Sequence, residues 1–226
     1  MITRLPTWVW LGAASLAMIA GMVNVVGYLG FEHQAITHLT GTTSLLGAAI
    51  ARGDTRSETH LLVIVLSFVG GAMLSGLIIQ DSTLRLGRRY GVALAIESML
   101  LFAAVPLFEH RQIAGAALAA VAIGLQNAMT ATYSGTLVRT SHLTGMFTDL
   151  GMFLGHRLRG VPAEPRRLWL CLAIIGGFLA GGVVGGLLFP TFSYRTLYLP
   201  AALTGITGVA YAIYRHRRGP AGTLSP

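Results

Sequence analysis

Hydrophobic residues fill six stretches of the chain, and the polar and charged residues gather between them. Each stretch is about as long as the roughly 20 apolar residues that a helix needs to cross a bilayer. Glu97 is the only ionisable acid or base inside them. The pattern predicts six transmembrane helices, at Trp8–Gly30, Leu61–Gln80, Tyr90–Phe108, Gln112–Ser134, Leu168–Phe189 and Leu197–Tyr214.

Two shorter apolar segments, Leu39–Ala51 and Leu143–Gly155, each begin within a copy of the tetrapeptide His-Leu-Thr-Gly. A helix of that length covers roughly 20 Å, whereas the hydrocarbon core of a bilayer is about 30 Å thick. We therefore predict two short re-entrant or broken helices in addition to the six spans. The fold class is an all-α integral membrane protein.

The order long, short, long, long occurs twice, which indicates two repeats, about 8–110 and 111–214, within one membrane domain. A shift of about 105 residues superposes further positions: Gly21 and Asn24 fall on Gly124 and Asn127, and Gly70, Gly71 and Gly76 fall on Gly176, Gly177 and Gly182. If each half crosses three times, the halves are inverted, as in many transporters. The alternative is eight spans with parallel repeats.

The composition agrees with a membrane protein. Of 226 residues, 54% are hydrophobic and 11% charged, whereas a soluble domain has roughly a quarter charged residues. The net charge of +8 comes from 16 basic residues, all arginine and all outside the six stretches. Arginines favour cytoplasmic loops, so we expect both termini, including the basic tail 215–226, in the cytoplasm. Short loops form no folded basic face for nucleic acid.

The starts of the two short helices are the candidate site. The first turn of a helix leaves backbone N–H groups unpaired and carries partial positive charge, which suits an anion or the oxygen of a polar solute. We expect Thr40 and Thr144 to cap these helices and Gly41 and Gly145 to let a ligand approach closely. The sequence thus predicts a site for a small solute where the two starts meet.

Four polar side chains beside these starts extend the predicted binding site. They are Asn24 and His38 in the first half and Asn127 and His142 in the second. Polar groups at membrane depth need protein or water around them, and a shared cavity would supply both. Alternatively, each asparagine makes a hydrogen bond between helices and each histidine bonds a backbone carbonyl.

Two carboxylates at membrane depth, Glu97 and Asp149, are candidates for coupling a proton to transport, since such acids typically belong to ion paths or proton relays. Asp149 stands opposite Leu45 in the repeat, so it would make the two halves of the site unequal. The alternative is a structural pair between either acid and a histidine or arginine.

Other chemistry finds less support. A metal site of His38, His142 and Asp149 lacks any recognised ligand spacing, Cys171 is a single cysteine, and we predict no metal or cofactor. No nucleophile elbow or protease motif predicts an enzyme. The glycine stripes Gly70, Gly71, Gly76 and Gly177, Gly181, Gly185 favour close helix packing, either within the chain or in a homodimer. A non-transporting assembly protein is the second functional hypothesis, and an intramembrane enzyme is the third.

The chain resembles the YoaK-type family of small bacterial inner-membrane proteins. The resemblance is carried by Gly21–Asn24 with Gly27 and Tyr28, by His38–Gly41 with its threonine run, by Gly124–Asn127, and by Arg139–Gly145 followed by Thr148 and Asp149. It extends from about residue 10 to 214. It implies an inner-membrane protein with about six spans, and it implies no particular activity.

Overall fold

The computed structural model describes residues 7–31, 36–79, 88–134, 139–162 and 164–217, and all their regular structure is helical. The elements are α1 (Thr7–Gly30), α2 (Leu39–Arg52), α3 (Thr55–Ile78), α4 (Arg88–Glu109), α5 (Ile113–Ser134), α6 (Leu143–Leu158), α7 (Pro165–Phe192), the 3₁₀ helix η2 (Ser193–Leu197) and α8 (Tyr198–Arg217). The predicted all-α class is confirmed. Most of the predicted basic tail 215–226 lies outside the described residues.

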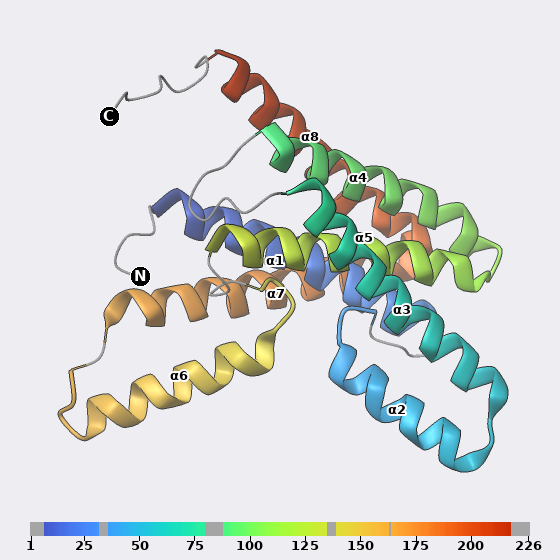
Figure 1. Ribbon diagram of the computed structural model, residues 1–226, viewed down its shortest axis with the longest axis horizontal. Coiled ribbons are helices and arrows are strands. Elements are labelled where there is room, and N and C mark those ends of the chain that lie inside the picture. The colour runs from blue at the N-terminus through green and yellow to red at the C-terminus, as the bar shows by residue number, and fades with distance from the viewer. Residues whose placement is uncertain (1–6, 32–35, 80–87, 135–138, 163, 218–226) are drawn as a thin grey trace.

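Within the described residues, five continuous helical stretches are long and apolar enough to cross a membrane. Four correspond to α1, α3, α4 and α5, and the fifth, Pro165–Ile213, contains both α7 and α8. Figure 1 shows α7 and α8 running in different directions. The count of six crossings stays a prediction, although each of the six predicted stretches is largely helical.

α1 and α7 lie side by side, and so do α3 and α5. In Figure 1, α1 and α7 both run from left to right along the long axis, whereas α3 and α5 both run from right to left. α4 packs against α5 and α8, and the main buried core joins α1, α4 and α5. The first helix of each predicted half thus packs on the glycine-rich helix of the other half.

A glycine brings the backbones together in each of these two pairs. A Cβ atom at Gly21 in α1 would overlap the carbonyl oxygen of Phe178 in α7. In the same way, a Cβ at Gly124 in α5 would overlap the carbonyl oxygen of Phe68 in α3. Glycine is therefore required at both crossings, and the pairing of Gly21 with Gly124 in the sequence reappears in the packing.

A second pair of crossings fixes the correspondence between α3 and α7. Gly71 lies against the carbonyl of Val121, and Gly181 lies against the carbonyl of Met18. Gly71 therefore has its packing counterpart in Gly181, whereas the sequence comparison paired it with Gly177. Gly177 and Gly181 are four residues apart, about one helical turn, and therefore lie on the same face of α7. A comparison based on glycine spacing cannot distinguish between them.

The short helices form hairpins with the helices that follow them. α2 has 14 residues and α6 has 16, which correspond to roughly 21 and 24 Å and so to less than a bilayer core. Gly53 ends α2 in the left-handed conformation, with φ 66°. Asp54 then caps α3 by accepting a hydrogen bond from the Ser57 amide at 3.2 Å. α3 therefore begins at Thr55, six residues before its apolar pattern.

The glycine stripes divide into packed and open positions. Added Cβ atoms at Gly71, Gly177, Gly181 and Gly185 would contact neighbouring helices, whereas nothing lies within 4 Å of such an atom at Gly70 or Gly76. The packed positions serve contacts within the chain. A homodimer through the open positions stays a prediction.

Candidate solute cavity

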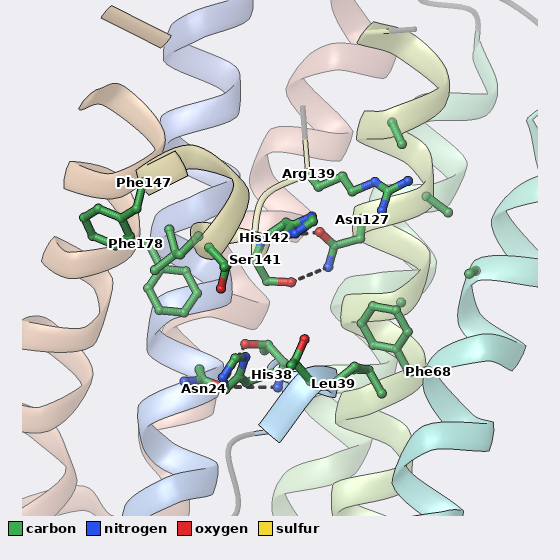
Figure 2. Close-up of a pocket in the computed structure, with 18 of the residues that line it drawn as sticks. Asn24, His38, Leu39, Phe68, Asn127, Arg139, Ser141, His142, Phe147 and Phe178 are labelled. Atoms are coloured by element: carbon green, nitrogen blue, oxygen red, sulfur yellow. Dashed lines mark hydrogen bonds between the residues drawn. The ribbon is translucent and has the colours of Figure 1, made fainter. Parts of the chain in front are cut away.

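The starts of α2 and α6 line one cavity of about 810 Å³. Figure 2 shows the α2 start, with His38 and Leu39, on one side of this space and the α6 start, with Ser141 and His142, on the other. α1, α3, α5 and α7 contribute the remaining walls. The volume lies within the roughly 300–1,000 Å³ typical of small-molecule sites.

Asn24 in α1 holds the segment that leads into α2. Its Oδ1 accepts hydrogen bonds from the Thr37 amide at 3.1 Å and from the Thr37 hydroxyl at 2.7 Å. Thr37 immediately precedes His38, so these bonds fix where the short helix begins. The carboxamide oxygen is therefore used to position the chain, although Asn24 also lines the cavity.

Asn127 in α5 does the same for α6. Its Oδ1 accepts from the Ser141 amide at 3.2 Å and from the Thr140 hydroxyl at 3.3 Å, and its Nδ2 donates to the Ser141 hydroxyl at 2.8 Å. Nearby, the Gln126 amide donates to Thr140 at 2.6 Å. The two asparagines thus bond to the segments before the short helices. The sequence had suggested either contact with a solute or a hydrogen bond between two helices.

The histidines, not the threonines, occupy the N-cap positions of the short helices. This corrects the expectation that Thr40 and Thr144 are the caps: α2 begins at Leu39 and α6 at Leu143, one residue before each threonine, and the caps are His38 and His142. Neither imidazole makes a capping hydrogen bond. Both threonines line the cavity.

Each imidazole instead lies over the glycine three residues later. An added Cβ at Gly41 would be 3.0 Å from His38 Cδ2, and one at Gly145 would be 3.4 Å from His142 Nε2. The spacing in His-Leu-Thr-Gly therefore leaves room for the ring above the first helical turn. Gly41 does not line the cavity, whereas Gly145 lines a second, smaller one.

The smaller cavity, of about 450 Å³, lies on the α6 side and shares Arg139, His142 and Thr144 with the larger one. Asp149 lines it and forms an ion pair with Arg167 at the start of α7, with 2.7 Å between Asp149 Oδ1 and Arg167 Nη2. Both side chains are partly exposed. Asp149 therefore has a cationic partner and stands beside the main cavity, not in its wall.

Glu97 lies elsewhere in the molecule. It is on α4, fully buried, and lines neither cavity. Neither of its carboxyl oxygens has a hydrogen-bond partner within the part of the chain that the structure describes. The two predicted acids therefore occupy different environments, one paired at the edge of the site and one buried away from it.

Arg139 is a site residue that the sequence prediction missed. It is exposed, lines both cavities, and no ion pair links it to an acid of the described residues. Figure 2 shows it with Asn127, Ser141 and His142 on the α6 side. Its place just before Thr140 and the second histidine motif was the available signal. Three aromatic residues also line the larger cavity, and no sequence motif pointed to them: Phe68, Phe147 and Phe178.

Among the described residues, no group of three or more His, Cys, Asp or Glu side chains is placed to hold a metal ion. In particular, Asp149 lines only the smaller cavity and His38 only the larger one. The polar side chains at the site are instead amides, hydroxyls, two imidazoles and a guanidinium, which suit hydrogen bonding to an organic or anionic solute.

Long apolar helices around a cavity with polar and aromatic walls define this chain as a polytopic α-helical membrane protein. It belongs to the family described as "Protein of unknown function (DUF1275)", whose model matches residues 12–210. It is 25% identical over 199 residues, 83% of this chain and 87% of the relative, to the UPF0700 transmembrane protein YoaK of Bacillus subtilis (strain 168). The resemblance found in the motifs is thereby confirmed. No solved structure matches the chain.

Proposed function

We propose that this protein is a transporter or channel that carries a small polar or anionic solute through the cavity between α2 and α6. The observation that carries the proposal is that both short helices begin at this one cavity. Short helices that start at membrane depth supply unpaired N–H groups and partial positive charge to a solute. Discontinuous helices of this kind are a recurrent element of transporter sites.

We further propose that the halves are inverted repeats. Support comes from the matching glycine crossings of α1 with α7 and of α5 with α3, and from the opposite directions of these two pairs in Figure 1. The equivalent bonds of Asn24 and Asn127 to the segments before the short helices agree with the same relation. In this arrangement α2 and α6 would enter the membrane from opposite sides.

For localisation we propose the bacterial inner membrane, with both termini in the cytoplasm. The arginine distribution and the resemblance to a bacterial transmembrane protein support this placement. Fusion of a reporter that is active only in the cytoplasm to each terminus tests it. Signal from both fusions is expected, and signal from only one would imply an odd number of crossings.

The direct test is solute flux into liposomes that contain the purified full-length chain. The panel comprises small inorganic anions, organic anions and neutral polar solutes, each with and without a proton gradient. We expect flux of at least one class, and we expect Ala72→Trp to block it because Ala72 lines the cavity. Ala103→Trp, on an exposed face of α4, is the matched control. Absence of flux across the panel would refute transport.

If transport is proton-coupled, we propose Glu97 as the proton carrier in preference to Asp149. Intramembrane acids typically belong to ion paths or proton relays, and Asp149 is already paired with Arg167. Flux driven by a proton gradient should become independent of the gradient in Glu97→Gln and should keep its dependence in Asp149→Asn. The reverse pattern would assign the role to Asp149.

A further inference from the structure

We infer that the cavity selects an organic anion that combines one carboxylate with a compact apolar body. This inference rests on the proposed transport function, since it concerns the solute of the same cavity. Three features of the walls carry it: an arginine with no acidic partner among the described residues, a set of aromatic rings, and polar groups that are already engaged with one another.

Arg139 supplies the charge. Arg139 lines both cavities, and Asp149, the carboxylate that lines the smaller cavity, is bonded to Arg167. Among the described residues, no Asp or Glu lines the larger cavity. A guanidinium is always charged and presents parallel N–H donors that match the two oxygens of a carboxylate. The positive charge of Arg139 is therefore available to a bound anion.

Aromatic and aliphatic side chains make much of the remaining wall. Phe68 from α3, Phe147 from α6 and Phe178 from α7 line the cavity with Leu39 and Leu143. Figure 2 shows Phe147 and Phe178 together near the α6 start and Phe68 on the other side, toward α3. Such walls favour an apolar or aromatic body, because contact with them removes apolar surface from water.

The engaged polar groups argue against a small hydrated anion. To bind phosphate or chloride, a site must replace the water of hydration with several donors. Here Asn24 accepts from Thr37, while Asn127 and Ser141 bond each other. These bonds hold the loops, so the groups that make them are not free to surround an ion. Arg139, the unpaired N–H groups of the two helix starts and an apolar wall together suit an amphipathic carboxylate better, because a small ion would leave the apolar wall unfilled.

Equilibrium binding to the full-length chain in detergent tests this inference, with benzoate as the probe. Benzamide has the same ring and no charge, and phosphate has charge and no apolar body. We expect benzoate to bind about tenfold or more tightly than either, because it alone makes the charge-assisted bonds and fills the apolar wall. This comparison uses the unmodified protein, so it does not depend on how a variant folds.

Variants then assign the role of the guanidinium. Arg139→Gln should weaken benzoate binding about tenfold or more, and Arg139→Lys should retain part of the affinity, because it keeps the charge without the forked geometry. Arg52→Gln is the matched control, since Arg52 is an exposed arginine in the last turn of α2 and lines neither cavity.

Equal binding of benzoate and benzamide, or stronger binding of phosphate, would overturn the inference. Unchanged benzoate affinity in a folded Arg139→Gln variant would also overturn it. The flux assay distinguishes this outcome from failure of the proposed function. Transport of a neutral solute without benzoate binding would contradict only the inference about the solute. Selective benzoate binding without flux supports the inference and contradicts transport.

Discussion

The helices α2 and α6 begin in the same way but carry different charges. In both, an asparagine on a neighbouring long helix accepts a hydrogen bond from the amide just before the N-cap histidine. In both, the imidazole lies over a glycine. On the α6 side, however, Arg139 lines the cavity and Asp149 pairs with Arg167, whereas Leu45 stands at the position of Asp149 in α2.

This difference separates the residues of the site into two sets. The shared residues position two helix starts at one cavity, and the unshared residues give that cavity its charge and one charged edge. A duplicated framework can therefore stay nearly symmetric while the chemistry of the site is set by a few side chains on one side. We expect substitutions in the two sets to have different effects.

The largest expected effect is at the helix crossings, where the two halves should respond alike. Gly21→Ala and Gly124→Ala each place a Cβ on a backbone carbonyl oxygen, of Phe178 and Phe68 respectively. Because backbone cannot move aside as a side chain can, we expect both variants to lose most of their folded, monodisperse yield in detergent. Size-exclusion chromatography measures this yield.

Gly70→Ala is the matched control for the crossings. Nothing lies within 4 Å of an added Cβ there, and alanine favours a helix by about 1 kcal/mol over glycine. The variant should be as stable as the parent or more stable. A loss at only one of Gly21 and Gly124 would break the symmetry that we describe.

The next effect concerns the asparagine anchors. Among the described residues, Asn127→Ala removes bonds to Thr140, Ser141 and the Ile123 carbonyl, whereas Asn24→Ala removes two bonds to Thr37. A buried group left without its partner costs about 1–3 kcal/mol, so we expect both variants to melt earlier, and Asn127→Ala earlier than Asn24→Ala. Thermal melting in detergent measures the difference.

Thr132→Ala serves as the control for Asn127→Ala. Thr132 lines the same cavity from the same helix, but its hydroxyl donates to the Ala128 carbonyl within α5. Its substitution should change the melting temperature little. If it were as harmful as Asn127→Ala, the loss would reflect the cavity surface in general and not the anchoring of α6.

A smaller effect distinguishes the two histidine-glycine contacts. Gly41→Ala should cost more stability than Gly145→Ala, because the nearest ring atom would lie at 3.0 Å in the first case and at 3.4 Å in the second. The double change His38→Ala with Gly41→Ala should recover part of the loss by removing the ring. Thermal melting provides the comparison, and equal losses without recovery would contradict the contact.

The smallest effect is expected for the ion pair that only the α6 side possesses. Asp149 and Arg167 are partly exposed, so a double-mutant cycle with Asp149→Asn and Arg167→Gln should give a coupling of about 0.2–1 kcal/mol. Chemical denaturation in detergent measures it. A coupling of several kcal/mol would mean that the pair is essential to the site and not a secondary contact at its edge.

Hydropathy predicted the long helices well because a bilayer demands continuous apolar sequence, and it placed the starts of both short helices correctly. It missed the first six residues of α3, which are mostly polar and follow the N-cap Asp54. The repeat pointed to Asn24 and Asn127, but their partners Thr37 and Ser141 depend on how a loop folds back. The phenylalanine walls required the tertiary arrangement, because only packing brings α3, α6 and α7 to one cavity. Arg139 could have been proposed from its place just before Thr140 and the second histidine motif.

The most direct test of the central claim is whether water reaches both helix starts within the membrane. Thr40→Cys and Thr144→Cys, each in a Cys171→Ala background, are treated in liposomes with a charged, water-soluble thiol reagent applied to both sides. Both should react, because both residues line the cavity. Met73→Cys, on an exposed face of α3 within its apolar stretch, should not. If neither cysteine reacted, the claim that α2 and α6 begin at a shared, water-accessible cavity would be contradicted.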